Sequence, residues 1–249
     1  MSEVHIFVTR ITIFTEAIWP SIEVTLEYLL SKRQEPIPDL VRAGLNFSIV
    51  LGSACYLEGV LEALLKAILG YRRAEFNRTK IEDFESRRAM NVYYNRLEED
   101  LSQRIGHSNG AQAYDEVLDL LAGQRLSQLK EVVPLWEGVT VLFNFRNVLG
   151  HGREVFASHF AGGAVGGGKE EFAGGYRKVE DYLRKQGLLS RRFVDAPSEY
   201  LFLSDPIADH FWGLAKALPT AILCSLPPAE QNACLKVLER ATEDTNADA

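Results

Sequence analysis

Cysteine is scarce in this sequence, and its few copies form no recognisable motif. Cys55, Cys224 and Cys234 include no CxxC pair and lie in apolar, helix-like surroundings. This arrangement excludes a disulfide framework and a zinc site of ordinary spacing. We therefore expect no metal and no cofactor, and we expect all three cysteines to be small hydrophobic residues of the core.

Long uninterrupted hydrophobic runs are missing as well. The apolar opening, MSEVHIFVTRITIFTEAIW, is broken by Arg10 and Glu16 and is followed by no small-residue cleavage site, so a signal peptide is not expected. No stretch reaches the ~20 uncharged apolar residues that a membrane-spanning helix needs. These absences predict a cytoplasmic protein without membrane contact.

Positive charge is in deficit. The chain has 27 lysines and arginines against 34 aspartates and glutamates, a net charge of −7, so the molecule as a whole repels polyanions. Any contact with RNA or DNA must then be local. Residues 71–90 and 177–192 are locally basic, but each stretch alone is typical of a solvated helix face and matters only if it flanks a site.

Helical patterning extends over almost the whole chain. Apolar residues make up 47% of the 249 positions, enough for a sizeable core, and they recur at three- and four-residue spacing. The sequence therefore predicts an all-α protein. The expected helices cover residues 11–32 with a second segment starting at Pro20, then 39–69, 84–104, 113–123, 125–133, 134–151, 176–189, 204–226 and 227–241.

The segment 39–69 is the expected centre of a helical bundle. It is long and apolar, and Gly52 and Gly59, with Ser53 and Ala54 between them, would let a neighbouring helix pack closely. Asp39 is the expected N-cap.

A glycine-rich segment interrupts the helical pattern. AGGAVGG lies between REVFASHF and KEEFAGGY, which favours a β-hairpin or mobile flap at about 153–176. We expect an N-terminal helical extension at 1–35, one helical domain at 36–243 that contains this insertion, and a flexible tail at 244–249.

The same segment contains a false phosphate loop. Gly163 to Lys169 match the first seven positions of a Walker A motif, but the eighth is Glu170, where a serine or threonine must bind magnesium. Gly174 and Gly175 also break the helix that should follow. We therefore do not expect an NTP-binding loop.

The most informative stretch is FRNVLGHGREV at 145–155. Asn147 and His151 are four residues apart, about 40° around a helix, while Arg146 and His151 are separated by about 140°. Arg146 and His151 can still meet if Gly150 unwinds the last turn, or if a second subunit completes the site. An imidazole that titrates near ~6.5 and a permanently charged guanidinium together suit proton transfer at a phosphate. A plainer alternative is that His151 caps the helix end.

The string Arg146-Asn147-Val148-Leu149-Gly150-His151 resembles the signature of the HEPN superfamily. The resemblance implies an HEPN-like helical bundle that pairs as a homodimer, and a metal-independent endoribonuclease with Arg146, Asn147 and His151 as catalytic residues. It also implies a toxin or phage-defence role, with an antitoxin or regulatory protein as a possible partner. The partner would be RNA at a local site, and we expect Arg177, Lys178, Arg184 and Lys185 to contribute to its binding.

Two other readings remain open. HEPN-type proteins also include non-catalytic modules that bind RNA or nucleotides, and the acidic balance of the chain favours this alternative. The second alternative is a purely architectural dimer, in which Arg146 and His151 only cap helices. His210, between Asp205 and Asp209, is expected at the edge of the core and satisfied by a neighbour, because no third ligand is spaced to make a metal site.

Overall fold

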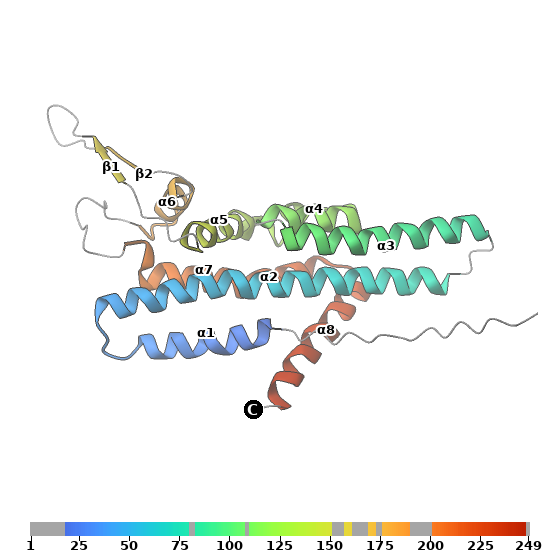
Figure 1. The fold of residues 1–249 in the computed structure, drawn as a ribbon, viewed down its shortest axis with the longest axis horizontal. Helices are drawn as coiled ribbons and strands as arrows, with labels where there is room; N and C mark the ends of the chain where they lie inside the picture. The colour runs from blue at the N-terminus through green and yellow to red at the C-terminus, as the bar shows by residue number, and fades with distance from the viewer. Residues whose placement is uncertain are drawn as a thin grey trace, which may run out of the picture.

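The computed structural model shows an all-α protein in the part of the chain that it describes, apart from one short two-stranded ribbon (Figure 1). The described residues are 18–79, 83–107, 110–150, 157–160, 169–172, 176–189 and 201–247. The helices are α1 (Trp19–Arg33), α2 (Asp39–Arg78), α3 (Phe84–His107), α4 (Ala111–Ala122), η1 (Leu126–Gln128), α5 (Val133–Gly150), α6 (Tyr176–Lys185), η3 (Leu201–Leu203), α7 (Asp205–Ser225) and α8 (Pro228–Ala247).

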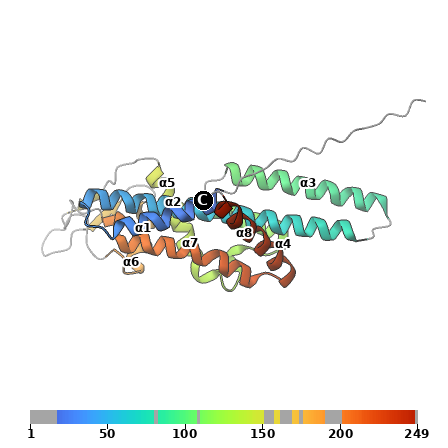
Figure 2. The same cartoon turned by 90° about the horizontal axis from the view of Figure 1, so that it is seen from below.

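Helix α2 is the centre of the bundle, as the sequence predicts. It extends along most of the molecule, with α1 on one side, α4 and α5 on the opposite side, and α7 running alongside (Figures 1 and 2). Its C-terminal part continues past the expected end near Leu69 and pairs with α3 in a helical arm. Its length and composition alone would suit a membrane span, but its apolar face is buried against the neighbouring helices.

The small residues of α2 allow α1 to approach closely. A Cβ at Gly52 would lie 2.7 Å from Leu26 Cδ2, and one at Gly59 would lie 2.8 Å from Trp19 Cβ. The two glycines are two helical turns apart, so both face α1. The prediction of a closely packed neighbour is confirmed, and that neighbour is α1.

Helix α5 is anchored by Phe145, which is fully buried. Its ring contacts Phe211 of α7 at 5.8 Å between centroids, Phe202 at 6.3 Å and Tyr176 of α6 at 6.5 Å. Successive residues of a helix point about 100° apart. Because Phe145 points into this aromatic cluster, Arg146 must point to another side of α5.

Two local predictions about the helices were wrong. Pro38 is the N-cap of α2, and Asp39 is the first helical residue, where its charge complements the helix dipole without capping. The segment 125–133 is largely not helical, because the buried Asp115 carboxylate accepts hydrogen bonds from Ser127 N at 2.7 Å and Ser127 Oγ at 3.0 Å and so stabilises a short 3-10 turn.

The cysteines are also not all core residues. Cys234 is buried, as expected, but Cys55 and Cys224 are exposed. Both exposed cysteines belong to helices with an uncovered side, and hydrophobic residue type alone does not say which side of an amphipathic helix is covered.

The ribbon consists of β1 (Ala157–Phe160) and β2 (Lys169–Phe172), which pair antiparallel with His159 opposite Glu170. Lys169 and Glu170 therefore lie in a strand, where a phosphate loop would require the start of a helix. This placement agrees with the rejection of a P-loop. The residues between the two strands lie outside the described part of the chain.

A buried ion-pair network ties α1 and α2 to the start of α7. The side chain of Arg33 is 4% exposed; it donates to Asn46 Oδ1 at 3.0 Å and to Asp209 Oδ1 at 2.5 Å. Asn46, fully buried, donates to Leu203 O at 2.7 Å and to Asp205 Oδ1 at 2.8 Å. Partial burial raises the pKa of Asp205, but hydrogen bonds from Asn46 and Arg42 outweigh it and hold the pKa below 3.8.

His210 is satisfied by a neighbour, as predicted. Its Nε2 is 2.8 Å from the hydroxyl of Tyr182, which belongs to α6. The two helices approach across Gly138 of α5, where a Cβ would lie 2.4 Å from the same hydroxyl. Burial lowers the pKa of His210 below 6.5.

The lowered pKa of His210 predicts that the protein loses stability in mild acid. A group whose pKa is lower in the folded state favours folding while it is neutral, so this stabilisation is complete above pH ~6.5 and is lost as the pH falls below that value. We expect the free energy of unfolding, measured by urea denaturation, to fall between about pH 7.5 and about pH 5. His210→Gln should weaken this dependence; an identical pH dependence in both proteins would contradict the assignment.

Candidate functional site

Arg146 lies near the C-terminal end of α5 and reaches across to α2. Its Nη1 donates a hydrogen bond to Glu58 Oε2 at 2.5 Å, and its Nε donates to Asn147 Oδ1 at 3.1 Å. The side chain of Arg146 is 18% exposed and that of Glu58 is 26% exposed. The guanidinium is therefore held by two partners and is still reachable from solvent.

Glu58 lies on α2 among apolar residues, and these surroundings shift the pKa of its carboxyl group. Burial raises the pKa of the carboxyl above 4.5, the charge and hydrogen bond of Arg146 lower it, and nearby Glu62 raises it again. The net shift is upward. A carboxylate in these surroundings is stabilised by its pairing with Arg146, because desolvation alone would disfavour the charge.

The ring of Phe143 lies beneath Arg146, and Tyr114 packs against that ring. The guanidinium carbon lies 5.6 Å from the ring centroid of Phe143, one turn earlier on α5, within the range of a cation–π contact. The same Phe143 ring packs against Tyr114 of α4 at 5.9 Å between centroids. Glu58, Tyr114, Phe143 and Arg146 thus bring α2, α4 and α5 together at one point, which we call the Arg146 junction.

The structure describes two of the three motif residues that we expect to be catalytic, Arg146 and Asn147. Arg146 and Asn147, which an ideal helix points in different directions, are brought together by the hydrogen bond between their side chains. The described part of α5 ends at Gly150. His151 itself lies outside the described residues.

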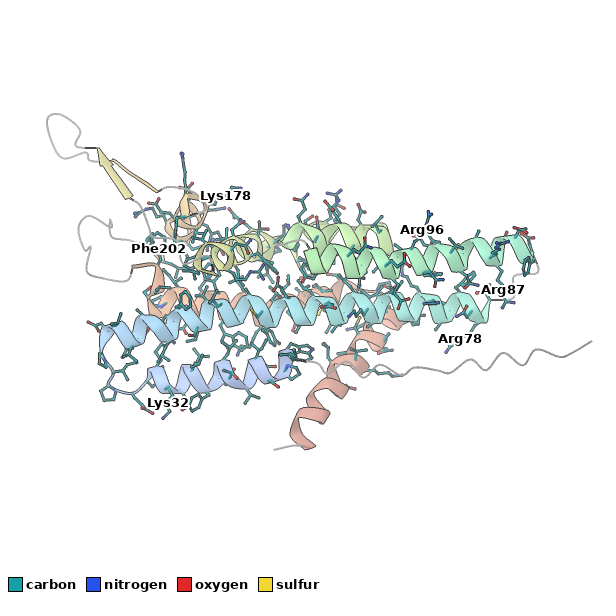
Figure 3. The ribbon with its side chains drawn as sticks, in the orientation of Figure 1. Lys32, Arg78, Arg87, Arg96, Lys178 and Phe202 are labelled. Carbon is teal, nitrogen blue, oxygen red and sulfur yellow. The ribbon has the colours of Figure 1, made fainter. Side chains whose placement is uncertain are left out.

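The expected RNA-binding residues belong to α6 and fall into two pairs. Arg177 and Lys178 are exposed, and Figure 3 shows Lys178 at the end of the molecule where α6 lies. Arg184 Nε instead donates to Glu180 Oε1 at 2.7 Å, and Lys185 Nζ contacts Glu137 Oε2 at 2.6 Å. Their charges are therefore partly neutralised within the protein.

The basic stretch 71–90 is far from α6. Arg78 and Arg87 lie at the tip of the α2–α3 arm, at the opposite end of the molecule from Lys178 (Figure 3). Arg78 is 20 residues beyond Glu58 on the same helix, which corresponds to about 30 Å. The two basic stretches thus do not flank one site.

Glu58 and Tyr114 were not predicted as site residues. Glu58 carried one usable signal, since it is an acidic residue inside the apolar run of the central helix, where an ionisable group needs a partner. Tyr114 carried none, because its spacing on α4 is that of an ordinary core residue. Only the packing of α4 against α5 brings it to Arg146.

No three histidine, cysteine, aspartate or glutamate side chains gather into a metal-ligand group among the residues that the structure describes. Comparison of the chain with protein-family models, with curated proteins and with solved structures gives no match. The function must therefore be argued from the site itself.

Proposed function

We propose that this protein is a metal-independent endoribonuclease of HEPN type that acts through Arg146, Asn147 and His151. The observation that carries the proposal is the Arg146 guanidinium, held at the end of α5 by Glu58 and Asn147 and still partly exposed. A fixed guanidinium stabilises charge that develops on a phosphate in the transition state. His151, five residues after Arg146 in the sequence, supplies an imidazole, a group that ordinarily titrates near neutral pH.

In the proposed reaction the RNA supplies its own nucleophile. The 2′-oxygen forms a bond to the adjacent phosphorus while the bond from phosphorus to the 5′-oxygen breaks. The 2′-hydroxyl gives up its proton and the departing 5′-oxygen receives one, and His151 serves one of these two transfers. Arg146 holds the scissile phosphate and Asn147 orients Arg146. The products carry a 2′,3′-cyclic phosphate and a 5′-hydroxyl.

The proposal includes the architecture of the HEPN superfamily. The helices would form an HEPN-like bundle with a hairpin insertion at about 153–176, and two copies would pair so that their motifs share one cleft. The exposed Arg177 and Lys178 support an RNA path that continues along α6. A toxin or defence role, with a restraining antitoxin, is part of the same proposal.

His151→Ala tests the catalytic role. Loss of the proton-transfer group should reduce RNA cleavage by about 10²–10⁴-fold, while the circular dichroism spectrum and the melting temperature stay unchanged. The measurement is cleavage of mixed RNA in excess chelator, with analysis of the product ends. Cleavage that persists in the variant at the wild-type rate would reject the assignment.

The second candidate function is a binding module without chemistry, and the net charge of −7 favours it. Such a module leaves RNA intact during long incubation, and its Arg146→Ala variant loses affinity instead of rate. The same RNA incubation therefore separates the two functions.

A further inference from the structure

Three polar groups at the Arg146 junction have hydrogen-bonding capacity that no described residue uses. Glu58 accepts from Arg146 through Oε2 alone, and Arg146 donates through Nε and Nη1 but not through Nη2. The Tyr114 hydroxyl makes no hydrogen bond with any residue that the structure describes, and its oxygen is not among the fully buried atoms that lack a partner. The junction thus offers one acceptor and two donors.

Tyr114 is the least expected of the three. The residue as a whole is only 2% exposed, and a tyrosine in such a position ordinarily pairs its hydroxyl within the protein. The Tyr114 oxygen is not among the fully buried atoms that lack a partner, so a ligand at the junction can reach it. Burial raises the pKa of Tyr114, as do the charges of Glu58 and Glu62, while Arg146 lowers it. The hydroxyl therefore keeps its proton at neutral pH and is a donor within the field of these charges.

The three groups select for a particular ligand. The Glu58 carboxylate offsets part of the attraction between Arg146 and a phosphate. A ligand that carries a hydroxyl group beside its phosphate gains an additional hydrogen bond, because the Glu58 carboxylate accepts from the hydroxyl. A ribose with its phosphate offers both groups, whereas deoxyribose lacks the 2′-hydroxyl.

We propose that the Arg146 junction binds one ribose-phosphate unit of RNA, with Tyr114 and Arg146 donating to the phosphate and Glu58 accepting from the ribose 2′-hydroxyl. The inference rests on the proposed function and identifies two further substrate-binding residues of the same site. It also makes Glu58 the residue that distinguishes RNA from DNA. Glu58 retains its second role, since Oε2 continues to hold Arg146.

Tyr114→Phe tests the phosphate contact, because it removes only the hydroxyl. In a His151→Ala background that leaves RNA intact, we expect binding of a labelled single-stranded RNA to weaken by about tenfold, the effect of one hydrogen bond to a charged group. The melting temperature should stay equal or rise, since no intramolecular hydrogen bond is lost. Fluorescence anisotropy in excess chelator measures the affinity.

Tyr56→Phe is the matched control. Tyr56 is also buried, and its hydroxyl also bonds to no residue in the described part of the chain, but its ring lies between Trp19 and Trp212 on another side of α2. This variant should keep both its stability and its RNA affinity.

Glu58→Gln tests the ribose contact. The amide oxygen still accepts from Arg146, but the amide nitrogen replaces the acceptor that faces the ligand. We expect the ratio of RNA affinity to affinity for the matching single-stranded DNA to fall by about tenfold. Glu62→Gln, one turn further along α2 in an exposed pair with Lys66 at 2.5 Å, should leave this ratio unchanged.

The outcomes separate this inference from the proposed function. If Arg146→Ala abolishes RNA binding while Tyr114→Phe and Glu58→Gln behave like their controls, the ribose-phosphate assignment is overturned and the function stands. A wild-type chain that neither binds nor cleaves RNA overturns both. Reduced affinity in Tyr114→Phe together with reduced RNA preference in Glu58→Gln supports the assignment.

Discussion

Arg146→Ala should lower the rate of RNA cleavage by about 10²–10³-fold, the usual cost of removing one group that stabilises transition-state charge. The Arg146 side chain reaches from α5 to the Glu58 carboxylate on α2. Its loss also leaves Glu58 without its cation, so the carboxylate would repel the incoming phosphate. The measurement is the cleavage rate of mixed RNA under single-turnover conditions.

Arg146→Lys makes the prediction more specific. An ammonium group keeps the charge but cannot hold Asn147, Glu58 and a phosphate at fixed angles, as a planar guanidinium does. The lysine variant should therefore recover only a small part of the lost rate.

Arg125→Ala is the control for this series. Arg125 is also paired, with Asp119 at 3.2 Å, but both side chains are well exposed, and such pairs contribute little. This variant should cleave RNA at the wild-type rate. If Arg125→Ala and Arg146→Ala had the same effect, the role of the junction in catalysis would be refuted.

Arg33→Met should lower the free energy of unfolding by about 3 kcal/mol, because removal of one member of a buried polar network leaves the others unpaired. The Oδ1 atom of Asn46 would lose its donor in a fully buried position. Asp205 and Asp209 would lose a cation as well, although both are partly exposed. Methionine fills similar space, so the loss reports the polar contacts and not a cavity.

The adjacent residue provides the control for stability. Lys32 pairs with Glu35 at 2.7 Å in an exposed position, and Lys32→Met should change the free energy of unfolding much less than Arg33→Met does, because solvent screens an exposed pair. Urea denaturation of the two methionine variants measures both values under one set of conditions. Equal losses in the two would show that the buried network contributes no more than a surface pair.

Helical periodicity alone determined the all-α class and the central position of α2. The spacing of apolar residues in 39–69 requires burial on several sides of the helix, and Gly52 and Gly59 on one face require a close neighbour. Both features follow from the order of residues within one segment. The same holds for His210, whose place among apolar residues requires a hydrogen-bond partner. The sequence could not say that the partner is Tyr182.

The composition of the Arg146 junction was decided by tertiary structure. Glu58 and Arg146 are 88 residues apart, and no local pattern relates one position to the other, since their contact depends on how α2 and α5 pack. The exposure of Cys55 and the ion pairing of Lys185 have the same origin. Periodicity gives each helix its apolar face, but the depth and partners of a polar side chain depend on which helix covers it.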